Sequence, residues 1–145
     1  MGKHRIGVVA DTHNRLPGRV LELLVGVKEI WHLGDVVDEG TLDPLFTLGV
    51  ALTVIRGNND FSPWPLTADL KRGELRFHLV HIPPVKSPSC DILIHGHTHV
   101  PRDEMVAGVR WLNPGSAGLA NKGAPRSVGL LTVDGNRLEW QVLLV

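Results

Sequence analysis

The chain of 145 residues carries 15 lysine and arginine residues and 15 aspartate and glutamate residues, so its formal net charge is zero. This balance argues against binding to long nucleic acids or to an anionic membrane surface. No apolar stretch is long enough to span a membrane, and no signal peptide is recognisable, so we expect a cytoplasmic protein. Cys90 is the single cysteine, which excludes an internal disulfide and a cysteine-based zinc finger. The length and the hydrophobic fraction of 43% suit one domain covering residues 1–145.

The first half of the chain alternates between predicted strands and helices. Apolar runs that end at turn residues predict strands at residues 6–10, 29–33, 50–55 and 74–80. The apolar spacing over residues 16–27 predicts an amphipathic helix, with Pro17 in its first turn. A shorter helix is expected at residues 44–48, capped by Asp43. This order is typical of an α/β protein.

The second half of the chain has a different character. Strands are expected at residues 92–94, 104–112, 127–133 and 138–144, with a hairpin turn at Asp134-Gly135. The proline-rich stretch around Trp64 predicts a rigid loop. Trp64 could line a substrate entrance there, with packing at the edge of the core as the alternative.

Five of the predicted strands end in side chains that could bind a metal or a phosphate. These side chains are Asp11, His13, Asp35, Asn58, His81, His97 and His99. Residues i and i+2 of an extended chain point the same way, so Asp11 and His13, and likewise His97 and His99, should share a face. Open α/β sheets bind ligands at the carboxyl ends of their strands. We therefore expect one shared polar site built from mixed carboxylate, imidazole and amide ligands, which suit manganese, iron or zinc.

The order of these motifs resembles the calcineurin-like metallophosphoesterases. The matching segments are Asp11-x-His13, Gly34-Asp35, Gly57-Asn58-x-Asp60, His81, Gly96-His97-x-His99, Asn113-Pro114-Gly115-Ser116 and Pro125-Arg126. The last two are similar to the small prokaryotic phosphodiesterase branch, which is related in fold to the retromer subunit. The resemblance implies a four-layer α/β/β/α sandwich of two mixed β-sheets flanked by helices.

The resemblance also implies two divalent metal ions and assigns their ligands. Asp11, His13 and His99 would hold the first ion. Asn58, His81 and His97 would hold the second, and Asp35 would bridge the pair. Manganese is the ion expected first, with iron, zinc or nickel as alternatives. Two such ions can clamp a phosphate and generate a hydroxide nucleophile, so the expected reaction is hydrolysis of phosphodiesters or activated phosphomonoesters.

Two features depart from the family pattern. Many members place a leaving-group acid, histidine, where this chain has Asn59, and a carboxamide has no titratable proton near neutral pH. The segment after His81, residues 82–88, is too short and too rich in proline for the usual crossover helix. The competitor for the His81 position is His78, which lies inside its predicted strand.

Several other polar residues are candidates for the reaction centre or for phosphate binding. Asp35, Asn58 and Asn59 are expected at the reaction centre, and Asn14 and Arg56 could contact the phosphate, with structural roles as the alternative for both. Asp60 could orient a ligand. The expected substrate is a small phosphoester, and the chain could form a homo-oligomer. A non-catalytic protein-binding scaffold of the same fold is the competing function.

Overall fold

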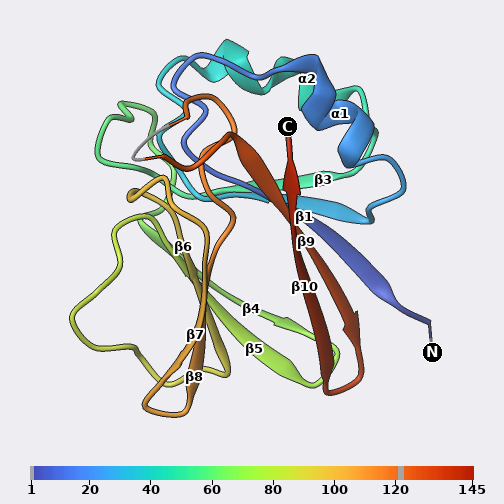
Figure 1. Ribbon diagram of the computed structural model, residues 1–145, viewed down its shortest axis with the longest axis vertical. Helices are drawn as coiled ribbons and strands as arrows, with labels where there is room; N and C mark the ends of the chain where they lie inside the picture. Colours follow the sequence, from blue (N-terminus) through green and yellow to red (C-terminus); the bar gives the residue numbers. More distant parts are fainter. Residues whose placement is uncertain (1, 121–122) are drawn as a thin grey trace.

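The computed structural model describes residues 2–120 and 123–145. Its strands form two five-stranded sheets that pack against each other (Figure 1). The first sheet has the order β10-β9-β1-β2-β3 and contains β1 (His4–Val9), β2 (Glu29–His32), β3 (Ala51–Val54), β9 (Ser127–Asp134) and β10 (Arg137–Leu144). The second has the order β4-β5-β6-β8-β7 and contains β4 (Thr67–Arg72), β5 (Leu75–Val80), β6 (Ile92–His95), β7 (Arg102–Val106) and β8 (Val109–Asn113).

Both sheets are mixed, as expected. Strands β1, β2 and β3 run parallel to one another, and so do β5, β6 and β8. The remaining strands, β9 and β10 in one sheet and β4 and β7 in the other, pair antiparallel. Parallel neighbours end at the same edge of a sheet, so the chain segments that follow β1, β2 and β3 emerge together.

Alternate residues of the first sheet pack on its two faces. Ile6 and Val8 of β1 enter the core between the sheets, together with Phe77 of β5. Val9 points the other way and packs with Val20 beneath the helices. This alternation follows from the two-residue period of a strand. The central strands β1 and β2 are therefore buried on both faces, which explains their continuous apolar runs.

Helices cover only the first sheet in the described part of the chain (Figure 1). They are α1 (Gly18–Leu23), the 3₁₀ helix η1 (Glu39–Leu42) and α2 (Asp43–Phe46). The segment between β5 and β6 contains no helix, as its prolines predicted, although those strands are parallel. Buried Cys90 packs there with Leu93 and Trp111 on the outer face of the second sheet. Among the described residues, no helix is long and apolar enough to cross a membrane.

Three details of the sequence-based prediction were wrong. Residues 67–72 form a strand, β4, that the partly exposed and charged sequence did not indicate. The single strand expected at residues 104–112 is part of a hairpin that turns at Ala107 and Gly108, both with positive φ. Asp43 is the first residue of α2 and not its cap. The capping side chain is Asp38, which accepts a hydrogen bond from the backbone N–H of Gly40 at the start of η1.

Candidate metal centre

The predicted site residues follow neighbouring parallel strands of both sheets. Asp11, Asp35 and Asn58 lie after β1, β2 and β3 of the first sheet. His81 follows β5 of the second sheet, and Gly96-His97-Thr98-His99 follows β6. The two sheets therefore bring the carboxyl ends of five parallel strands to one place, where all seven predicted ligands gather.

One group of potential ligands is made of Asp11, His13 and His99, whose ligand atoms all lie within 4.8 Å of one another. Asp11 Oδ1 is 3.6 Å from His99 Nε2 and 4.0 Å from His13 Nε2. The rings of His13 and His99 meet edge to face with centroids 5.2 Å apart. Asp35 Oδ2 is 3.4 Å from His13 Nε2, so its carboxylate also faces this group.

A second group is made of Asp11, Asp35 and His81, again with ligand atoms within 4.8 Å of one another. His81 Nε2 is 3.3 Å from Asp35 Oδ2 and 2.9 Å from Asn58 Oδ1. Asn58 Oδ1 in turn lies 3.1 Å from His97 Nδ1. Asp35 thus stands between His13 and His81, while Asp11 belongs to both groups.

Two buried polar atoms at the site have no hydrogen-bond partner among the residues that the structure describes. They are Asp11 Oδ1 and His13 Nε2. An unpaired buried carboxylate oxygen is costly because burial removes its hydration without replacing it. A divalent cation coordinated by both atoms would remove that cost. The donor set of oxygens and imidazole nitrogens matches first-row transition metals, so these residues fit a metal centre.

His81 is held with one ring nitrogen aimed at the acidic cluster. Its Nδ1 donates to the carbonyl oxygen of Leu33 at 2.8 Å, which leaves Nε2 facing Asp35 and Asn58. A backbone bond of this kind fixes the orientation and tautomer of a metal-binding histidine. The imidazole is buried, so the short loop after β5 does not carry it away from the site.

The carboxylates and imidazoles stabilise one another's charged forms. Burial by itself lowers the pKa of His81, but the hydrogen bond with Asp35 and the charges of Asp11 and Asp35 outweigh it, so the pKa is raised. The neighbouring carboxylate of Asp11 raises the pKa of His99. Burial raises the pKa of Asp35, yet hydrogen bonds from His81 and Asn59 overcome this effect and lower it. The Asp35 carboxylate is therefore ionised at neutral pH and can attract a cation.

The backbone is unusual at most of the predicted ligands. Positive φ angles occur at Asp11, His13, Asp35, His97 and His99. Such angles are uncommon for residues other than glycine, and they gather at functional sites because surrounding contacts must enforce them. The expected extended geometry at Asp11-x-His13 and His97-x-His99 was therefore wrong. His99 faces His13, whereas His97 faces His81, with ring centroids 5.2 Å apart in each pair.

Asp60 organises the loops that carry Asp35. Its Oδ2 accepts hydrogen bonds from the backbone N–H groups of Asp35 and Gly57, at 2.8 and 2.7 Å, and its Oδ1 accepts one from Val37 at 2.7 Å. Gly57 passes so close that a Cβ atom there would lie 2.2 Å from Asp35 Oδ1. This geometry agrees with the expected orienting role of Asp60.

The turn that begins at Asn113 borders the site, as its sequence suggested. Asn113 Nδ2 donates to the carbonyl oxygen of Gly96 at 3.2 Å and to Thr98 Oγ1 at 3.0 Å. Ser116 Oγ donates to the backbone oxygen of Asp11 at 2.9 Å. The turn therefore supports both the β6 loop and the β1 loop. The sequence indicated a turn here that could border the site, but it did not indicate the contacts, since Ser116 and Asp11 are 105 positions apart.

The predicted ligands do not include His32, His78 or His95. His78 Nδ1 is 2.7 Å from Asp69 Oδ1, on the β4–β5 pair, so it does not compete with His81. His32 and His95 are buried, and burial lowers the pKa of each to about 4. His32 accepts a hydrogen bond from the backbone N–H of Gly34, and His95 contacts Trp111 edge to face. Both pack as structural residues.

The structure places Asn14 and Arg56 at the margin of the site. Asn14 Oδ1 accepts the backbone N–H of Asp38 at 2.8 Å, which ties two loops together. Arg56 lines a pocket that also includes Asn58 and His81. The side-chain oxygen of Asn14 therefore has a structural contact, and Arg56 lies beside two of the predicted ligands.

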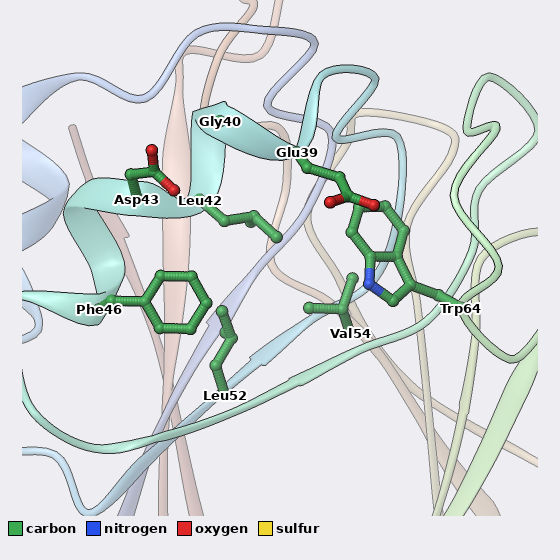
Figure 2. A pocket seen from close by; sticks show the side chains of 8 residues that line it. All are labelled: Glu39, Gly40, Leu42, Asp43, Phe46, Leu52, Val54 and Trp64. Carbon is green, nitrogen blue, oxygen red and sulfur yellow. The ribbon is translucent and has the colours of Figure 1, made fainter.

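Trp64 belongs to a different part of the molecule. A hollow of about 500 Å³ lies between η1, α2 and β3. Figure 2 shows Trp64 at one end of it and Phe46 at the other. None of the predicted metal ligands lines it. Trp64 is half-buried against the core beneath the helices. Packing at the edge of the core is thus its observed role.

The sequence matches the family model of the calcineurin-like phosphoesterase superfamily domain over residues 5–136. The chain belongs to this superfamily. It is 32% identical to a probable metallophosphoesterase of Methanocaldococcus jannaschii, in an alignment that covers 79% of this chain and 69% of that protein. It is 30% identical to the phosphodiesterase YfcE of Escherichia coli, with 80% and 79% covered.

Solved structures show the same fold. Vacuolar Protein Sorting 29 from Cryptosporidium parvum superposes with a TM-score of 0.83 at 25% identity, covering 97% of this chain and 90% of that one. YfcE from E. coli, described as a phosphoesterase, superposes with a TM-score of 0.77 at 26% identity, covering 92% and 90%. The metallophosphoesterase fold expected from the motif order is therefore confirmed.

Proposed function

We propose that this protein is a phosphoesterase that uses two divalent metal ions to hydrolyse phosphodiesters or activated phosphomonoesters of small molecules. The observation that supports the proposal most directly is the pair of ligand groups that share Asp11 and flank Asp35. Family membership and relatives named as phosphodiesterases point the same way.

The proposed ligands lie on the two sides of Asp35, whose Oδ2 is 3.4 Å from His13 Nε2 and 3.3 Å from His81 Nε2. Asp11, His13 and His99 would hold one ion, Asn58, His81 and His97 would hold the other, and Asp35 would contribute to both. Manganese is our first choice of metal, with iron, zinc and nickel as alternatives. The ions would neutralise the charge of the phosphate. They would also lower the pKa of a water molecule, so that hydroxide would be available to attack the phosphorus atom.

The protein side chains position these groups. Asn59 holds Asp35 through its side-chain N–H, and Asp60 holds the loops of both. Arg56 contributes a cation beside Asn58, within the pocket that adjoins the site. Asn14, exposed next to His13, contacts the phosphate in this proposal. Because Asn59 replaces a titratable acid, esters with good leaving groups should react faster than alkyl esters.

One observation favours the scaffold as a second candidate. Phe61, Leu66, Ile82 and Val85 expose 93%, 58%, 49% and 108% of their surface, and all four lie on loops or strand ends near the site. Exposed apolar side chains can form a contact surface for another protein. The fold of Vacuolar Protein Sorting 29 is compatible with this alternative.

The deciding experiment measures hydrolysis of bis(p-nitrophenyl) phosphate by metal-stripped protein, with and without added manganese. We expect manganese-dependent turnover that falls by roughly 10²-fold or more in His97→Ala, because an exposed ligand is lost without disturbing the core. His78→Ala is the matched control, since its imidazole lies on the β4–β5 pair outside the site. If manganese, iron, zinc and nickel all fail to support turnover, the scaffold becomes the better explanation.

A further inference from the structure

A pocket of about 410 Å³ opens beside the candidate metal centre. It lies between the loop that follows β3, the start of β4 and the end of β5. Its lining residues are Arg56, Gly57, Asn58, Leu66, Thr67, Val80, His81 and Ile82. It is separate from the hollow of Figure 2, which shares none of these residues.

The pocket and the metal centre have two residues in common. Asn58 and His81 line the pocket, and their Oδ1 and Nε2 atoms, 2.9 Å apart, face the second ligand group. A phosphate held at that group would therefore lie directly at the mouth of the pocket. One of the two organic substituents of a phosphodiester would extend into it.

The walls of the pocket indicate the chemistry of that substituent. Leu66, Val80 and Ile82 present aliphatic side chains, and Leu66 and Ile82 remain 58% and 49% exposed. Covering such surface is favourable because it removes apolar area from water. Among the described residues no carboxylate lines the pocket, and its exposed surface is almost entirely apolar.

We infer that this pocket is a substrate subsite for a bulky apolar substituent of a phosphodiester. The inference rests on the proposed function and makes it more specific. The preferred substrates are diesters that carry a bulky apolar group, such as an aryl ring, and small dialkyl diesters are poor substrates. Ile82 and Leu66 act as specificity-determining residues, because they contact the substituent and not the reacting atoms.

The kinetic test compares p-nitrophenyl phenyl phosphate with p-nitrophenyl methyl phosphate. Both release p-nitrophenolate, so the difference in kcat/KM reports on the second substituent. We expect the phenyl ester to be preferred by roughly 10–100-fold, the range for filling an apolar pocket. In the double variant Leu66→Ser/Ile82→Ser this ratio should fall to within about threefold, because the apolar walls are lost. Val85→Ser is the matched control, since Val85 is 108% exposed on the same loop and does not line the pocket.

A binding measurement separates this inference from the proposed hydrolysis. Calorimetry would compare diphenyl phosphate with dimethyl phosphate on the manganese-loaded protein and on the metal-stripped protein. Tighter binding of the diphenyl ester that is lost in the double variant supports the subsite even if neither ester is hydrolysed, in which case only the hydrolase proposal fails. Equal binding of the two esters, or a phenyl preference that survives in the double variant, overturns the subsite whatever the turnover.

Discussion

Asn59 donates one hydrogen bond to each carboxylate oxygen of Asp35. Its backbone N–H lies 2.9 Å from Oδ1, and its side-chain Nδ2 lies 2.9 Å from Oδ2. The loop after β3 therefore fixes a carboxylate that follows β2. The residue that departs from the family pattern in the sequence thus has a clear positioning role in the structure, directly on the proposed bridging ligand.

Asn59→Ala should weaken metal binding. The backbone hydrogen bond to Oδ1 remains, but Oδ2 loses its donor, and Asp35 can turn away from the position between His13 and His81. Residues that hold a metal ligand commonly contribute about 10–100-fold to affinity. Manganese titration followed by calorimetry would measure the change. Asn136→Ala, in the exposed turn between β9 and β10, is the control and should bind manganese as the unaltered protein does.

Asn59→His tests the lack of a leaving-group acid. An imidazole at this position can donate a proton, and general acid catalysis is commonly worth about 10²–10⁴-fold. We expect faster hydrolysis of alkyl phosphoesters, with little gain for p-nitrophenyl esters, whose leaving group needs no proton. The rate with the alkyl ester should fall as the pH rises through the pKa of the new histidine. An unchanged alkyl rate at every pH would show that position 59 does not face the leaving group.

Gly57→Ala should disrupt the site without removing any ligand. The added Cβ atom would lie 2.2 Å from Asp35 Oδ1 and 2.3 Å from the Asp35 backbone nitrogen, so the two loops must separate. We expect manganese-dependent hydrolysis to fall by about tenfold or more, since small displacements of a reacting centre have large effects. Gly18→Ala is the matched control because no atom lies within 4 Å of its added Cβ. Similar activity in the two variants would contradict the close approach of Gly57 to Asp35.

The lowered pKa of Glu29 predicts that the free energy of unfolding falls in acid, independently of the metal centre. Burial alone would raise the pKa of this carboxyl, but hydrogen bonds from Arg72, His4 and Trp31 outweigh burial and lower it from 4.5 to about 2. The folded state therefore binds fewer protons than the unfolded chain between these values, and the stabilisation present above pH 4.5 is lost as the pH falls towards 2.

Urea unfolding across this pH range would measure the effect. At neutral pH we expect Glu29→Gln to lower the free energy of unfolding by roughly 2–4 kcal/mol, because Arg72 loses its charged partner. The difference between the two proteins should shrink as the pH approaches 2. A difference that stays constant with pH would mean that the carboxylate charge does not contribute.

Much of the order of strands and helices could be predicted, because it depends on residues that are close together in the sequence. The apolar runs of β1, β2 and β6 are largely buried, and each of these strands, like β5, is followed within three residues by a polar residue predicted to belong to the site. Strand β4 escaped prediction because it lies at the edge of the second sheet, where alternate residues are exposed and the apolar signal is weak. The hydrogen bonds between Arg72 and Glu29 could not be predicted for another reason, since these residues are 43 positions apart in the sequence.

The sequence by itself determined the strand ends, the types of ligand and their order, because each depends on a few neighbouring residues. Only the tertiary structure decided how the ligands are shared. The backbone N–H of His97 donates to Asp11 Oδ2, 86 residues away, while His99 turns towards His13. These directions depend on left-handed backbone angles that contacts between the two sheets enforce. Local spacing carries no record of such contacts. The resemblance had implied two groups of ligands, but the place of Asp11 in both groups emerged only from the tertiary structure.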